Sequence, residues 1–354
     1  MQTLYQFGKD ATLRLIGDYL ELLEATRGLD DVGPSHFEKR EWRLFLLGGK
    51  GVQAHEMPET AQAAHALHSG RRAIDHDIQS AVAGPLYIEM QAHALSLARR
   101  AAVLSDGFTT LEADVLHDEP ELLPIYMHAA GVFSMSVLRK AVGTISDTGM
   151  SPRAAARAVD FLLPRLTGDV DPKRLVERLG STLEGQARDL LGRYLLEAVV
   201  EAAFRRHGVA FQRETEYKAL AGVVYDHRAD FVVPDATAPK LFVEVRRSSA
   251  RHSSLYAKDK MFSAINWKGR HSDLIGVLVI DGEWSQHSKL ALAHVFDYVL
   301  PVSAADELAR VAQAYLAGDT SKLLRTITFE ISARNGGELP RRPDAPLADS
   351  VPDP

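Results

Sequence analysis

The chain has 354 residues, of which 46% are hydrophobic and 25% charged, and its formal net charge is −6. This is the composition of an ordinary globular protein, and the length allows two domains. The lack of cysteine excludes disulfides and thiolate metal sites. No apolar run reaches about 18 residues and residues 1–15 do not resemble a secretory signal, so we expect a cytoplasmic protein with no membrane contact.

Residues 1–182 are predicted to form a large helical domain that serves in dimerisation or in DNA recognition. Leu13, Ile16, Leu20 and Leu23 recur at three- and four-residue steps, which is the spacing of one helix face. Ser151 followed by Pro152 predicts an N-cap and the first position of another helix.

The pattern changes after about residue 183, where strands and helices alternate. The predicted elements are a helix over 183–207, strands over 209–217, 223–233 and 241–245, a helix over 254–267, a strand over 274–280, a helix over 286–296 and a strand over 298–300. This order predicts an α/β domain over 183–335 with a mixed sheet whose antiparallel strands come first. Residues 336–354 are polar and rich in proline, so we expect a disordered tail.

Two acidic residues lie in consecutive predicted strands. Asp230 belongs to the second strand and Glu244 to the third, where Phe242, Val243 and Val245 surround it. A strand-turn-strand unit can place the two carboxylates side by side, and two such oxygen donors suit Mg²⁺. The alternative is that they form ordinary salt bridges with the following arginines: Arg228, Arg246 and Arg247.

The wider pattern resembles the PD-(D/E)XK nuclease superfamily, and its shape is similar to type II restriction endonucleases. The resemblance covers residues 185–301 and consists of Asp230, the triplet 244–246, an acidic residue on the preceding helix and the strand 276–281. It implies a mixed-sheet nuclease core that binds Mg²⁺ through Asp230 and Glu244. It also implies a third metal ligand from the helix, which we assign to Glu197, with Glu201 one turn later as the rival.

The triplet departs from the family at its third position, where Arg246 stands in place of the usual lysine. An arginine cannot lose its proton, but it can hold a water or neutralise a phosphate. Lys258 or Lys260 on the next helix can supply the missing lysine instead. The remaining possibility is a core that has lost catalysis and only binds DNA.

A basic segment follows the triplet, with seven basic residues against one acidic residue over 246–270. Such residues contact phosphates, and arginine also reads guanine. The expected contacts with double-stranded DNA are Arg246, Arg247, Arg251, His252, Lys258, Lys260, Lys268 and Arg270.

These observations together predict a Mg²⁺-dependent DNA endonuclease, and specifically a sequence-specific restriction endonuclease. Because palindromic sites match two-fold symmetry, we expect a homodimer. The alternatives are a repair or recombination nuclease of the same superfamily, a noncatalytic DNA-binding protein on a nuclease fold, and a helical scaffold with no DNA role.

Overall fold

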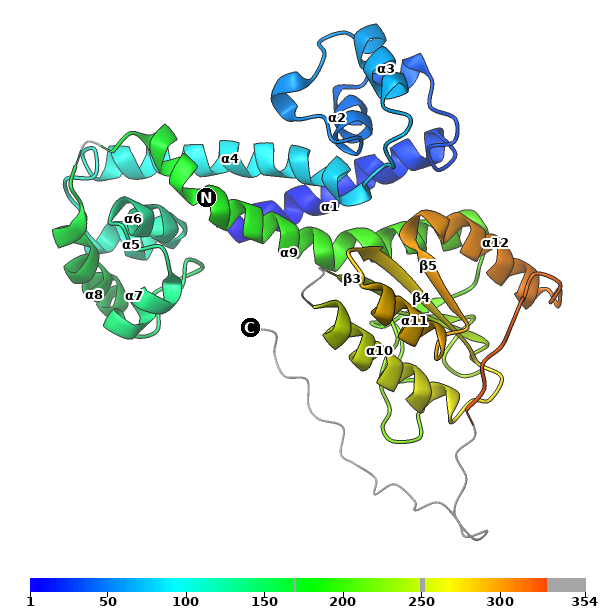
Figure 1. Cartoon of the computed structure of the whole chain (residues 1–354). Coiled ribbons are helices and arrows are strands. Elements are labelled where there is room, and N and C mark those ends of the chain that lie inside the picture. The colour runs from blue at the N-terminus through cyan, green and yellow to red at the C-terminus, as the bar shows by residue number, and fades with distance from the viewer. Residues whose placement is uncertain (169, 249–251, 330–354) are drawn as a thin grey trace. The chain divides into compact units, whose positions relative to one another are not determined.

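The computed structural model describes residues 1–168, 170–248 and 252–329 (Figure 1). In that part the chain is mixed α/β, with twelve α-helices and one five-stranded mixed sheet. It divides into two compact units, Met1–Leu195 and Leu196–Pro354. The division falls inside the long helix α9 (Pro172–Arg206), whereas the expected boundary followed residue 182. The expected disordered tail lies outside the described residues.

The first unit is helical, as predicted. Its α-helices, besides the first part of α9, are α1 (Leu4–Ala25), α2 (Arg40–Gly48), α3 (Ala61–Gly70), α4 (Ile78–Leu104), α5 (Ala113–Asp118), α6 (Leu123–Ala129), α7 (Met135–Val142) and α8 (Pro152–Leu162). Side chains cap several of them, and the predicted cap of α8 is confirmed, because the Ser151 side chain accepts a hydrogen bond from the backbone N–H of Ala154. Among the described helices, none is both long and apolar enough to cross a bilayer.

The second unit contains the sheet, with strands in the order β1 (Gln212–Arg213), β2 (Phe231–Val233), β3 (Leu241–Ser248), β4 (Ile275–Gly282) and β5 (Tyr298–Pro301). The first three strands are antiparallel neighbours, and β3, β4 and β5 are parallel. Its helices, besides the end of α9, are α10 (Ser253–Lys268), α11 (Gln286–Ala293) and α12 (Ala305–Leu316). The predicted order of alternating helices and strands is therefore confirmed up to β5.

The predicted strands at 209–217 and 223–233 are wrong in extent, since only two and three of their residues pair as strands. The buried Asn266 explains why the predicted strand over 223–233 is shorter than expected. Its side-chain oxygen accepts hydrogen bonds from the backbone N–H groups of Val224 (2.7 Å) and Tyr225 (3.2 Å). Its amide nitrogen donates to the Tyr225 carbonyl at 2.8 Å. A side chain thus satisfies backbone groups that a strand neighbour would otherwise bind.

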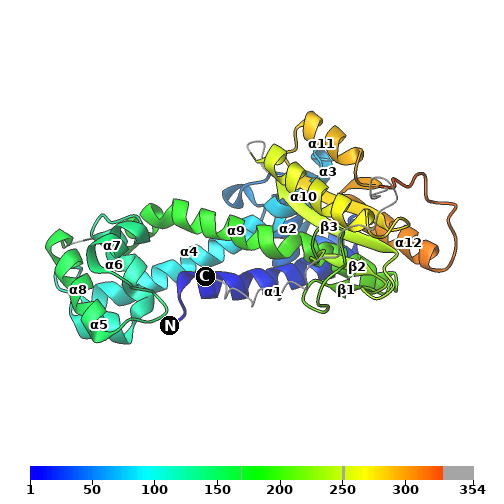
Figure 2. The same cartoon turned by 90° about the horizontal axis from the view of Figure 1, so that it is seen from below.

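The sheet carries an apolar layer on each face. Phe231 packs against Phe204 of α9, with ring centroids 5.8 Å apart. On the other face, Phe242 of β3 meets Trp267 of α10 edge-on, with centroids 5.0 Å apart. Helix α10 lies along β3 in both views (Figures 1 and 2). Because side chains alternate along a strand, Glu244 and Arg246 share the α10 face with Phe242.

Candidate functional site

Asp230 and Glu244 are brought together at the start of β2. The antiparallel register pairs Phe231 with Val243, so the next position outward sets Asp230 opposite Glu244. Residues in this relation have Cβ atoms about 5 Å apart and point to the same face. We had expected Asp230 to lie within the strand, but it lies one residue before β2. Its Oδ2 accepts a hydrogen bond from the backbone N–H of Val245 at 2.6 Å.

Lys260 of α10 completes this cluster, because its Nζ donates to Oε2 of Glu244. The side chains of Glu244 and Lys260 are 3% and 15% exposed. Burial raises the pKa of Glu244 to about 8, and the Asp230 carboxyl adds to this effect while Lys260 opposes it. For Lys260, burial lowers the pKa, but Glu244 and Asp230 outweigh burial and the net shift is upward. We call Asp230, Glu244 and Lys260 the carboxylate–lysine cluster.

The phase of α10 explains why Lys260, and not Lys258, reaches the carboxylates. Three residues of one helix face, Tyr256, Lys260 and Trp267, lie over three alternate residues of β3, which are Arg246, Glu244 and Phe242. Lys258 lies about 200° around the helix from Tyr256 and is exposed. Of the two candidate lysines, the structure therefore places Lys260 at the cluster and Lys258 away from it.

The three arginines of the salt-bridge alternative have other contacts. Arg247 pairs with Asp281 at 2.5 Å, and Arg228 donates to the backbone carbonyl of Glu214 at 3.3 Å. The guanidinium carbon of Arg246 lies 4.0 Å from the centre of the Tyr256 ring. The alternative is thus wrong in its partners, since it is Lys260 that forms the ion pair with Glu244.

Glu197 lies at the edge of the cluster. The pKa of Glu197 is raised to about 7, mainly by burial and then by the nearby Asp230 carboxylate, while Arg213 opposes the rise. Arg213 of β1 binds Glu197 at 2.5 Å and the rival Glu201 at 2.8 Å. Sequence reasoning missed Arg213, because its position between two acids depends on where β1 crosses α9. No spacing in the sequence signals that crossing.

The predicted DNA contacts differ in burial and in whether they already have an ionic partner. Lys268 is fully buried and paired with Asp297, so its assignment to a DNA-binding surface is wrong. Arg247 is half-buried and already paired. The exposed members are His252, Lys258 and Arg270. Arg251 lies outside the described residues.

The donor set limits the kind of metal that suits the cluster. Over the residues that the structure describes, no three His, Cys, Asp or Glu side chains form a ready set of metal ligands. Mg²⁺ is commonly held by one or two carboxylates and completed by water and phosphate oxygens. Asp230 and Glu244 fit that role, because they are hard oxygen donors whose mutual repulsion a divalent cation would relieve.

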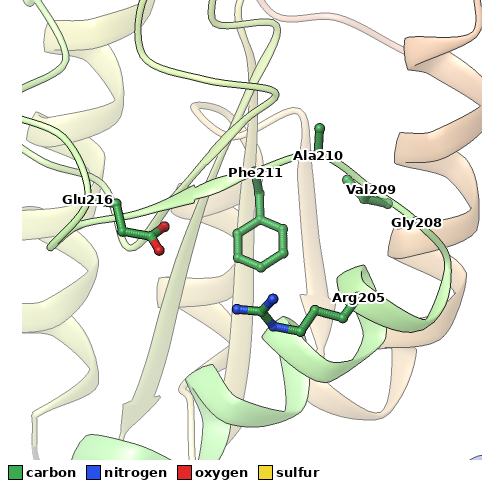
Figure 3. A pocket seen from close by; sticks show the side chains of 6 residues that line it. All are labelled: Arg205, Gly208, Val209, Ala210, Phe211 and Glu216. Carbon is green, nitrogen blue, oxygen red and sulfur yellow. The ribbon is translucent and has the colours of Figure 1, made fainter.

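A shallow hollow lies beside α9 and β1 (Figure 3), lined by Arg205, Gly208, Val209, Ala210, Phe211 and Glu216. Its charged groups are already engaged. Arg205 pairs with Glu201 at 2.7 Å, and Glu216 accepts a hydrogen bond from the backbone N–H of Arg213 at 2.7 Å. None of the carboxylate–lysine cluster lines this hollow, so the hollow and the cluster are separate features.

Comparison with known proteins returned no matching family model, no matching curated protein and no matching solved structure. Two adjacent carboxylates with a buried ammonium can hold a divalent cation and place a hydrogen-bond donor beside it.

Proposed function

We propose that the chain is a Mg²⁺-dependent DNA endonuclease of the PD-(D/E)XK kind, acting as a sequence-specific restriction endonuclease. The observation that supports this proposal is the carboxylate–lysine cluster, in which Asp230 faces Glu244 across β2 and β3 and Lys260 binds Glu244. The strand order agrees with it, since Glu244 lies on β3 and Asp230 directly precedes its antiparallel neighbour β2, and a helix and a parallel strand follow.

In this proposal each member of the cluster has one task. Asp230 and Glu244 bind the cation, which would polarise the phosphodiester and lower the pKa of a bound water. Lys260 holds the Glu244 carboxylate in place and donates hydrogen bonds to the attacking water or to a phosphate oxygen. Lys260 is proposed as a hydrogen-bond donor, because its ammonium already donates to Glu244.

Glu197 is proposed as an auxiliary acid. Its partner Arg213 keeps it on the α9 side of the sheet, close enough to Asp230 for their charges to interact. A cation at the cluster would favour the ionised form of Glu197, since a nearby positive charge lowers the pKa of a carboxyl. The restriction activity further implies a two-fold dimer, which sedimentation velocity measures directly.

The test is digestion of plasmid DNA with Mg²⁺. We expect D230N, E244Q and K260M to lose cleavage by at least about a hundredfold, since metal placement and proton positioning each contribute at that scale. Lys289 of α11 is exposed and outside the cluster, so K289M is the matched control and should cut like the unaltered protein.

The products decide among the alternatives. Discrete fragments support a restriction enzyme, and a smear supports a repair or recombination nuclease. Binding of DNA without cleavage at any Mg²⁺ concentration would support the noncatalytic protein. Full activity of D230N or E244Q would refute the cluster as the catalytic site.

A further inference from the structure

Arg246 packs against an aromatic ring and forms no ion pair with any residue that the structure describes. Its guanidinium lies over the Tyr256 ring of α10, with the guanidinium carbon 4.0 Å from the ring centre. Its Nε is buried and finds no hydrogen-bond acceptor among the described residues. The side chain as a whole is only half-buried, so its outer edge is accessible to a ligand.

Two arginines near the sheet, Arg213 and Arg247, differ from Arg246 in having carboxylate partners. Arg213 is matched by Glu197 and Glu201, and Arg247 is matched by Asp281. In the described part of the chain, no ion pair includes Arg246. A guanidinium that already packs against a ring loses less conformational freedom when it binds an anion, and its donors can match two oxygens of one anion.

The position of Arg246 indicates which anion it would bind. It lies two residues beyond Glu244 on the same face of β3, and Tyr256 and Lys260 are one turn apart on the helix above. An anion here therefore lies next to the carboxylate–lysine cluster, in the place of a backbone phosphate adjacent to the one that is cut.

We propose that Arg246 and Tyr256 form an anion subsite for a DNA backbone phosphate, in which Arg246 binds the phosphate and Tyr256 is a positioning residue. The identity of the ligand as DNA rests on the proposed function. The arrangement assigns Arg246 a role in binding, whereas the usual lysine at this place in the triplet acts in the chemical step.

The test measures binding apart from cleavage. A short fluorescent duplex of mixed sequence is titrated without divalent cations, and anisotropy gives the Kd at several salt concentrations. We expect R246Q to raise the Kd at least about tenfold and to lower the salt slope by about 0.9, the contribution of one phosphate contact. Y256L should raise the Kd about threefold or more with its net charge unchanged, because the guanidinium loses its support.

Two variants separate positioning from a general loss of charge or fold. Y256F keeps the ring and should bind like the unaltered protein. K289Q removes one exposed charge of the same unit and should also leave the Kd and the salt slope unchanged. If R246Q fails to fold by circular dichroism, R246K replaces it, and that variant should keep the salt slope while its Kd rises.

The outcomes distinguish this inference from the proposed function. If the protein cuts DNA while R246Q keeps the original Kd and salt slope, the subsite is refuted and the nuclease stands. If R246Q and Y256L bind weakly although the unaltered protein cuts nothing, the subsite stands and the catalytic assignment falls. Absence of any duplex binding at low salt would refute both, and equal binding by Y256L and Y256F would refute the role of Tyr256.

Discussion

The buried pair of Lys268 and Asp297 offers the sharpest test of the energetics of the second unit. Both side chains are completely buried, and the Lys268 ammonium binds the Asp297 carboxylate and the Leu274 carbonyl. The carboxylate also accepts a hydrogen bond from the backbone N–H of Gly276 at 2.6 Å. The other carboxylate oxygen accepts a hydrogen bond from the backbone N–H of Ile327. Substitution D297N leaves the lysine without its counter-ion and keeps an acceptor oxygen for only one of these two N–H groups.

The size of the effect follows from the proton on Lys268. Burial lowers the pKa of this lysine, and Asp297 opposes that shift. Without Asp297 the lysine must either stay charged in an apolar interior or lose its proton. From the ordinary lysine pKa of about 10.4, deprotonation costs about 4.6 kcal/mol at pH 7 and about 1.9 kcal/mol at pH 9. This agrees with the roughly 3–5 kcal/mol expected when one partner of a buried pair is removed.

The sign of the pH dependence is also determined. A folded-state lysine pKa below the unfolded value means that the unfolded chain binds more protons, so stability rises with pH. The destabilisation by D297N should therefore shrink between about pH 7 and pH 9, as measured by urea unfolding followed by circular dichroism. A loss below about 1 kcal/mol at pH 7, or a loss that grows with pH, would refute the reasoning.

Two controls accompany this measurement. The double variant K268M/D297N removes both charges, and we expect it to recover most of the lost stability, because an apolar replacement of a buried pair is often neutral. Glu307 and Arg310 form an exposed pair in the same unit, with side chains 60% and 61% exposed. E307Q should change the free energy of unfolding by no more than about 1 kcal/mol.

Three further predictions concern other buried contacts. Burial first, and then Lys50, lowers the pKa of His76 to about 4, so stability should fall by about 3 kcal/mol as the pH drops from about 6.5 to about 4, and H76Q should remove most of that fall in pH-dependent urea unfolding. N266A should lower the free energy of unfolding by about 2–3 kcal/mol and speed amide exchange over 222–226, because it removes three hydrogen bonds to the backbone of Val224 and Tyr225; normal exchange there would contradict the assignment. G276A should cost about 1–3 kcal/mol in thermal unfolding, since its Cβ would lie 2.6 Å from the Phe242 ring; an unchanged Tm would show that the ring moves freely.

Much of the second unit could be predicted from local patterns. The alternation of apolar runs and turn residues predicted the order of helices and strands, and the strand-turn-strand segment predicted that Asp230 and Glu244 are neighbours. The choice between Lys258 and Lys260 could not be made in this way. It depends on the rotation of α10 about its axis, which is set by contacts such as that of Trp267 with Phe242.

Errors arose where a side chain acts over a long distance in the sequence. Lys268 belongs to a basic segment, and its sequence context predicts a surface residue. In the structure it is buried because its ammonium pairs with the carboxylate of Asp297, 29 residues later. Asn266 similarly converts a predicted strand into a loop by binding backbone groups about 41 residues earlier. Such contacts carry no periodicity, so inspection of a single segment cannot reveal them.

The sequence by itself determined the order of helices and strands over 183–300 and the pair of acids, because these follow from the 3.6- and 2-residue periods of side chains along helices and strands. Only the tertiary structure decided which basic side chain pairs with Glu244, whether Arg246 has a carboxylate partner and which charged residues are buried. Those properties depend on the register between elements, and register is set by the packing of distant side chains rather than by any local preference.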